Sequence, residues 1–240
     1  FTPGPKGVED RTYDEEMKTI FADFQSRGVN EFVLDLRYNG GGYEHSANML
    51  AGLLIPEESK DNVFGIFSNN KGKVTHTRYF NTETKGTAGY LKLNSNRIYI
   101  LTSENTASSS ELVISSLEPF MNIVLIGQLT EGKNVGMQEY SDDKYEWAYW
   151  PITTRVTNAI NSDYSAGFTP DYDWNEFNLA QNPEDTLLPL GDSNEFMLNK
   201  AITLITGTHR KTRNMTILSQ TILRGQPVYQ SIDRHTTGGV

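Results

Sequence analysis

The chain has 240 residues, enough to bury a sizeable core in one large domain or in one domain with an appendage. Hydrophobic residues make up 37% and charged residues 21%, as in ordinary globular proteins, and the formal net charge of −9 argues against nucleic-acid binding. The lack of cysteine excludes a disulfide scaffold and a thiol nucleophile, and the four scattered histidines lack zinc-ligand spacing, so we expect no metal site.

The first half of the chain predicts an alternation of helices and strands, because apolar residues recur there at helical spacing and in short runs. Gly28 is placed to end the first helix. The expected elements are a helix that Thr12 begins, a strand over 31–36, a helix over 44–54, strands over 62–67 and 73–80, and a strand over 97–102.

The second half continues this alternation and then changes character. The expected elements are a helix over 107–117, a strand over 122–126, aromatic-rich β segments over 137–159, and a last helix over 195–205 that Asp192 caps. The strand–helix–strand order predicts an α/β fold with crossover connections. Because the sequence after Gly207 is polar and weakly patterned, we expect a core over 1–207 and a C-terminal tail over 208–240.

Three serines, Ser108 to Ser110, follow the strand over 97–102 at the expected first turn of a helix. The unpaired N–H groups and the positive dipole end of a helix start favour a developing alkoxide, and the following N–H can face an oxyanion. Serine is also a favoured helix cap, so this segment taken alone favours a capping role.

Two further segments suit acyl transfer. The glycines over 40–42 follow a buried strand, and they allow the close backbone approach that an oxyanion hole requires; a flexible turn is the alternative. Lys133 lies between Gly132 and Asn134 after the strand over 122–126, and it can act as a general base if burial lowers its pKa. Most lysines are simply solvated, so the combination of the three segments is what indicates a serine–lysine hydrolase.

The three segments, FVLDLRYNGGG, ENTASSSELVISSL and IGQLTEGKNVGMQ, resemble the signature blocks of the C-terminal processing (tail-specific) serine peptidases in sequence, order and spacing. By this resemblance Ser108 is the nucleophile, and Lys133, 25 residues downstream, is the general base. The resemblance also implies an oxyanion hole formed by the glycine loop, with Gly41 and Gly42 as candidates, and by the N–H of Ser109.

Some members of that family orient the lysine with a glutamine four residues beyond it. Here Met137 occupies that place and Gln138 follows, so Gln138 takes the catalytic role only if a one-residue bulge intervenes. Glu111 matches the acidic residue that ends the serine block, and we expect it to hydrogen-bond within the site or to favour the helix N-terminus. The implied fold is a ClpP/crotonase-like α/β spiral core, here with additional β-rich segments, acting on polypeptides without a cofactor.

The resemblance further implies a protein outside the cytoplasm, which is periplasmic, secreted or lipid-anchored. The chain begins at Phe1 without a signal-like segment, so we expect it to be a piece of a longer protein. Many members carry a PDZ domain before the core, and this chain has no room for one before Phe32, so we expect that the domain either precedes this piece or never belonged to the protein; a lipid anchor on the preceding segment is a further alternative. No run of about eighteen apolar residues is present, so we expect no membrane-spanning helix.

Two other functions remain open. One is a non-catalytic module that binds peptides or apolar ligands on the same fold, with the aromatic run from Tyr145 to Trp150 lining a groove or simply packing a sheet. The other, an acyl-CoA enzyme, has no support beyond the fold. The presence of both Ser108 and Lys133 favours the peptidase, in which a neutral Lys133 needs apolar surroundings and no carboxylate partner.

Overall fold

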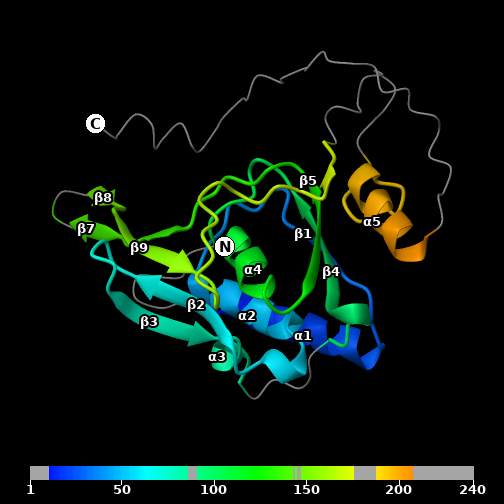
Figure 1. Cartoon of the computed structure of the whole chain (residues 1–240), viewed down its shortest axis with the longest axis horizontal. Helices are drawn as coiled ribbons and strands as arrows, with labels where there is room; N and C mark the ends of the chain where they lie inside the picture. Colours follow the sequence, from blue (N-terminus) through cyan, green and yellow to red (C-terminus); the bar gives the residue numbers. More distant parts are fainter. Residues whose placement is uncertain (1–10, 86–90, 143, 145–146, 176–187, 208–240) are drawn as a thin grey trace, which may run out of the picture.

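The computed structural model describes residues 11–85, 91–142, 144, 147–175 and 188–207 (Figure 1). The helices are α1 (Thr12–Ser26), α2 (Glu44–Leu54), α3 (Asn81–Thr84), α4 (Ser109–Leu117) and α5 (Phe196–Thr206), and 3₁₀ turns cover Glu57–Ser59 and Asn94–Asn96. The strands are β1 (Val33–Asp35), β2 (Val63–Ser68), β3 (Val74–Tyr79), β4 (Arg97–Thr102), β5 (Asn122–Gly127), β6 (Val135–Met137), β7 (Tyr140–Asp142), β8 (Trp147–Tyr149), β9 (Ile152–Thr157) and β10 (Tyr172–Asp173).

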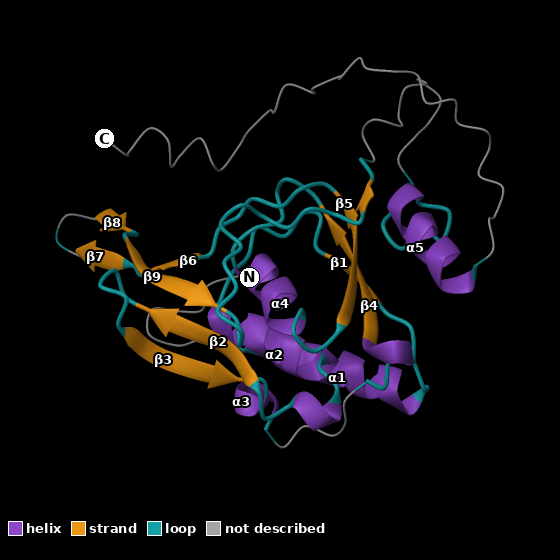
Figure 2. Ribbon diagram, viewed as in Figure 1, coloured by secondary structure: helices purple, strands orange, loops and turns teal. Residues whose placement is uncertain are grey.

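A parallel sheet with the strand order β1-β4-β5-β10 forms one half of the fold. Side chains of β4 alternate between its two faces: Ile98 and Ile100 join one hydrophobic core, and Tyr99 and Leu101 join another. Helices α1, α2 and α4 lie against the first face, and α5 lies against the second (Figure 2). The predicted α/β class is therefore confirmed.

A second, antiparallel sheet has the order β3-β2-β9-β6. Phe64 and Phe67 of β2 pack into the same core as α2 and α4, so these two helices lie between the two sheets (Figure 2). Beyond this sheet, β7 and β8 form a two-stranded hairpin that continues the ribbon of β6 and β9. The β segments expected over 137–159 are thus several short strands.

Most predicted elements are present, and α2 and β4 have the predicted bounds. Gly28 ends α1 as predicted, with a φ of +67°. The two predicted helix caps are wrong: α1 has Arg11 at its N-cap, so Thr12 lies inside the helix, and α5 is capped by Glu195. Asp192 instead accepts the N–H of Asn194 in the preceding turn, which occupies the residues before α5.

The predicted tail over 208–240 and Tyr145 of the aromatic run lie outside the described residues. The division of the chain at residue 207 therefore stays a prediction. Among the residues described, none of the helices combines the length and the apolar character needed to cross a membrane.

Candidate active site

Three neighbouring strands of the parallel sheet, β1, β4 and β5, end at the same edge. The loop after β1 carries the glycines over 40–42, the turn after β4 carries Ser108, and the loop after β5 carries Lys133. Ligand sites of open α/β sheets form outside the carboxyl ends of parallel strands. Figure 1 shows these loops together above α4, so segments far apart in the sequence meet at one edge of the sheet.

The three serines of the turn after β4 have different environments. The Ser109 hydroxyl donates to the carbonyl of Gly42 at 2.7 Å, and the Ser110 hydroxyl donates to the carbonyl of Asn39 at 2.9 Å. Both hydroxyls therefore tie the turn to the glycine loop. Ser108 is half-buried at the N-cap of α4 and, within the described residues, its hydroxyl donates to no part of that loop, which leaves it as the candidate nucleophile.

The backbone of Ser108 is strained. Its φ of 56° and ψ of −119° lie in a region that residues with a side chain rarely adopt. Ser108 and Glu111 form a capping box, but an ordinary N-cap residue has an extended backbone, so capping does not require this conformation. Strain of this kind costs about 1–3 kcal/mol and concentrates at functional sites, so the backbone distinguishes Ser108 from a simple cap.

Gly41 lies directly against the serine turn, with a φ of +105°. A Cβ placed on Gly41 would stand 2.7 Å from Ser108 Cβ, and 2.9 Å from both the Ala107 carbonyl oxygen and the Ser109 nitrogen. Any side chain at this position would push the glycine loop away from the turn. The sequence requires glycine here because of this close approach.

The backbone donors near Ser108 differ in availability. The N–H of Gly41 is occupied, because it donates to the side-chain oxygen of Asn39 at 3.0 Å. Within the part of the chain that the structure describes, the N–H groups of Gly42 and Ser109 donate to no protein acceptor. Two unused donors therefore lie where the glycine loop meets the serine turn.

Glu111 joins the serine turn to the lysine loop, and its side chain is fully buried. Its Oε2 accepts the N–H groups of Ser108 at 3.0 Å and of Lys133 at 2.8 Å, and its Oε1 accepts the Thr130 hydroxyl and the Gly132 N–H, both at 2.6 Å. Two nitrogens bonded to one oxygen lie within about 6 Å of each other. The predicted hydrogen bonding of Glu111 within the site is therefore confirmed.

The loop that carries Lys133 is tightly packed. The preceding Gly132 has a φ of +87°, and a Cβ there would stand 2.5 Å from the Ser165 carbonyl oxygen, so this loop rests on the next one. The Lys133 residue is half-buried. Among the residues described, its amine has no carboxylate within ion-pair distance.

Gln138 lies just beyond β6 and is exposed, and its Oε1 accepts the Tyr140 hydroxyl at 3.4 Å. The bulge that would shift Gln138 toward the lysine does not occur in β6. Gly136 pairs with Thr154 and Met137 pairs with Ile152, so the extra residue belongs to β9. The structure therefore does not bring Gln138 into hydrogen-bond contact with Lys133.

Tyr164 is a buried residue beside the site that the sequence did not reveal. It is 4% exposed and stacks on Phe168 with ring centroids 5.4 Å apart. Burial raises the pKa of the Tyr164 phenol, and the negative charges of Glu111 and Asp163 raise it further. The phenol therefore stays protonated near Glu111; the polar loop around it has no apolar periodicity that could have indicated a buried residue.

A buried ion-pair network supports the loop after β1. Arg37, whose side chain is 1% exposed, pairs with Asp35 at 2.7 Å and with Glu195 at 3.0 Å. Because Glu195 also caps α5, this network ties α5 to the loop that leads into the glycines. The contact between Arg37 and Glu195 joins distant parts of the chain, and no local pattern could have predicted it.

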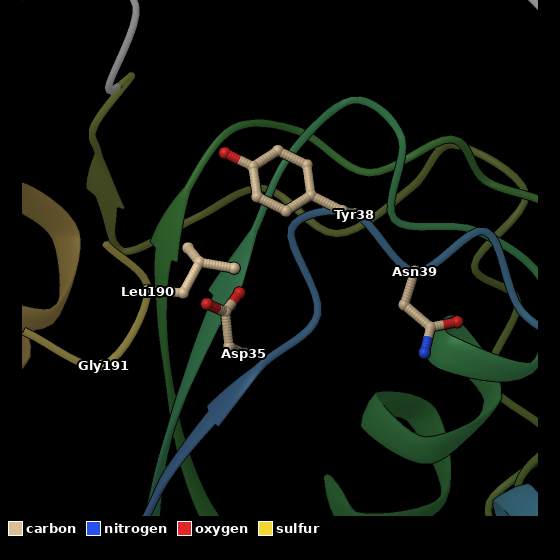
Figure 3. Close-up of a pocket in the computed structure, with 5 residues that line it drawn as sticks. All are labelled: Asp35, Tyr38, Asn39, Leu190 and Gly191. Carbon is tan, nitrogen blue, oxygen red and sulfur yellow. The ribbon is translucent and has the colours of Figure 1, made fainter. Parts of the chain in front are cut away.

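A pocket of about 520 Å³ lies at the end of β1, beside this network. Figure 3 shows Tyr38 and Leu190 near Asp35, with Asn39 on the side toward α4. Since Asn39 holds the N–H of Gly41, the pocket adjoins the glycine loop. Among the described residues, no cluster of three or more His, Asp or Glu side chains could hold a metal ion.

The sequence has relatives among known peptidases. The family model of peptidase family S41 matches residues 7–174, which include all three segments of the site. Carboxy-terminal processing protease CtpA of Bacillus subtilis (strain 168) is 26% identical over 133 residues, which are 55% of this chain and 26% of CtpA. The chain therefore spans about a quarter of that relative.

Solved structures agree with this match. A putative S41 protease from Bacteroides fragilis NCTC 9343 has a TM-score of 0.76 and 33% identity, covering 86% of this chain and 52% of the other. The photosystem II D1 C-terminal processing protease shares the fold, with a TM-score of 0.55 and 19% identity over 73% of this chain and 42% of its own. This chain thus spans about half of the first structure and about two fifths of the second. The family match covers well over half of the sequence, and the chain belongs to peptidase family S41.

Proposed function

We propose that the chain is the catalytic part of a serine endopeptidase in which Ser108 is the nucleophile and Lys133 is the general base. The observation that carries this proposal is the shared acceptor, since one oxygen of Glu111 binds the backbone N–H groups of both residues. A helix cap alone would need no such link to a lysine on another loop. The strained backbone of Ser108 supports the same assignment.

In the proposed mechanism, the neutral amine of Lys133 takes the proton of the Ser108 hydroxyl while Oγ attacks the scissile carbonyl carbon. The N–H groups of Gly42 and Ser109 stabilise the resulting oxyanion, and Gly41 allows their close approach. Collapse of this intermediate breaks the peptide C–N bond, and protonated Lys133 gives its proton to the leaving amine. Water then hydrolyses the acyl-enzyme. In this proposal Lys133 acts without Gln138.

The proposed substrate is a polypeptide, cut near a flexible or C-terminal end. CtpA is named for carboxy-terminal processing, and the family membership carries this preference to the present chain as a proposal. A location outside the cytoplasm, whether periplasmic, secreted or lipid-anchored, belongs to the same proposal.

The experiment compares cleavage of an unfolded protein by the wild type and by the Ser108→Ala and Lys133→Ala variants, with exposed Lys92→Ala as the control. We expect each catalytic variant to remain folded and to lose at least about a thousandfold in kcat/KM, with the control unchanged. Cleavage that survives in Ser108→Ala would show that Ser108 is not the nucleophile. An inactive wild type that still binds the polypeptide would favour the alternative of a non-catalytic binding module.

A further inference from the structure

Three aromatic side chains share one face of the β7–β8 hairpin. Tyr140 pairs with Tyr149 and Asp142 pairs with Trp147, and directly opposed residues of a hairpin lie on the same face. The rings of Tyr140 and Tyr149 are stacked with centroids 5.5 Å apart, and those of Trp147 and Tyr149 with centroids 5.4 Å apart. We call the rings of Tyr140, Trp147 and Tyr149 the aromatic platform.

The aromatic platform is open to solvent. Tyr140, Trp147 and Tyr149 are 43%, 48% and 51% exposed, so each ring packs on its neighbour but leaves much of its surface uncovered. Figure 2 shows the hairpin at the end of the β6–β9 ribbon, away from the helices. Cross-strand aromatic pairs do stabilise a hairpin, but contiguous exposed aromatic surface is also typical of binding sites.

The charge of the hairpin indicates what it would bind. In the sequence, the segment from Gln138 to Trp150 that carries the platform holds four acidic residues and one basic residue, Glu139, Asp142, Asp143 and Glu146 against Lys144. Asp142 stands directly opposite Trp147 of the platform. Aromatic faces attract Lys and Arg side chains, and nearby carboxylates strengthen this attraction. The complementary ligand is a cationic chain that also carries apolar side chains.

The platform is continuous with the candidate site. Lys133 precedes β6, and the same ribbon leads on to Tyr140, seven residues further along the chain. At about 3.3 Å per extended residue, these seven residues span at most about 23 Å, so the platform starts no farther than that from Lys133 along the chain. An extended polypeptide could reach both places at once.

We propose that the aromatic platform is a docking surface for a Lys- or Arg-bearing segment of an unfolded polypeptide, held by ring stacking and by cation–π contacts beside Asp142. The identity of this polypeptide as the substrate rests on the proposed function. The docking of a polypeptide to the platform does not depend on the proposed function, because docking requires neither Ser108 nor Lys133.

The test measures binding in the full chain carrying Ser108→Ala, so that no peptide is cleaved. The probes are two fluorescein-labelled unstructured peptides of Leu, Ser and Lys, identical except that Glu replaces Lys in the second. Trp147→Ala removes a platform ring. Trp150→Ala is the matched control, because Trp150 is 52% exposed and, among the described residues, its ring is not stacked on the platform rings.

By fluorescence anisotropy, we expect the Lys peptide to bind more tightly than the Glu peptide and to weaken as salt is added. Trp147→Ala should raise the Kd of the Lys peptide by about fivefold or more, and Trp150→Ala should leave this Kd unchanged. Asp142→Asn should also raise the Kd. Equal affinity for both peptides, or equal affinity in the two tryptophan variants, would overturn the proposal.

Two other occupants are outcomes of the same experiment. If Trp147→Ala converts a dimer of the chain into a monomer without changing peptide affinity, the platform is a contact between copies and the proposal is wrong. If Trp147→Ala abolishes co-sedimentation with anionic phosphatidylserine vesicles but not peptide binding, a membrane is the occupant and the proposal is also wrong. If the wild type cleaves nothing but binds the peptide in a manner that depends on Trp147, the peptidase proposal is wrong and the docking proposal stands.

Discussion

The four hydrogen bonds to Glu111 give the sharpest prediction about the site. In Glu111→Gln, the amide oxygen can replace Oε2 and still accept from Ser108 and Lys133. The amide nitrogen then replaces Oε1, where the Thr130 hydroxyl can turn and accept from it but the Gly132 N–H cannot. One buried donor therefore loses its acceptor, at a cost of about 1–3 kcal/mol, and the remaining bonds lose their charge assistance.

We therefore expect Glu111→Gln to lower the free energy of unfolding by about 2–4 kcal/mol and to keep measurable peptidase activity. Glu111→Ala leaves all four donors without an acceptor, so it should cost more and abolish activity. Urea unfolding followed by circular dichroism measures both effects, and Glu118→Gln on the exposed end of the same helix is the control. A Glu111→Gln variant as stable as the wild type would show that the hydrogen bonds from Thr130 and Gly132 to Oε1 do not stabilise the fold.

The remaining predictions concern three other positions. Burial raises the pKa of Tyr164, so the stabilisation linked to its protonated phenol is complete below about pH 10 and is lost above that pH, where Tyr164 ionises in the unfolded chain. Tyr164→Phe should therefore flatten the fall of the unfolding free energy at alkaline pH. Identical pH profiles of the wild type and the variant would contradict this. Gly41→Ala should lower kcat/KM by at least about a hundredfold, because its Cβ would clash with the serine turn. Gly40→Ala is the control and should keep kcat/KM, because its Cβ would come no closer than 3.9 Å to a neighbouring atom. Equal losses in the two variants would show that the close approach of Gly41 does not matter. Gln138→Ala should change kcat/KM by less than about threefold, because its side chain bonds to Tyr140, and a tenfold loss would restore its catalytic role.

The sequence predicted most of the helices and strands, and the three segments that follow β1, β4 and β5 could be picked out, because their signals are local. A buried strand followed by glycines, or by serines at a helix start, is a short pattern, and the bounds of α2 and β4 followed from such patterns. The gathering of the three segments follows from strand order, since β1, β4 and β5 are neighbours.

The features that the sequence did not predict depend on contacts between residues that are far apart in the chain. Asp192 fits the pattern of a helix cap, but Glu195 is the residue that caps α5, and it also pairs with buried Arg37. The partners of the Ser109 and Ser110 hydroxyls lie in the glycine loop, so their roles needed the fold. Likewise, the position of Gln138 depended on which of β6 and β9 carries the extra residue.

The most direct test of the central claim is to trap the acyl-enzyme. The chain is mixed with a peptide ester, quenched in acid during the first turnover, and mapped by mass spectrometry. We expect one acyl adduct on Ser108, which is lost in Ser108→Ala and does not accumulate in Lys133→Ala. An adduct on another residue, or continued turnover of the ester by Ser108→Ala, would show that Ser108 is not the nucleophile.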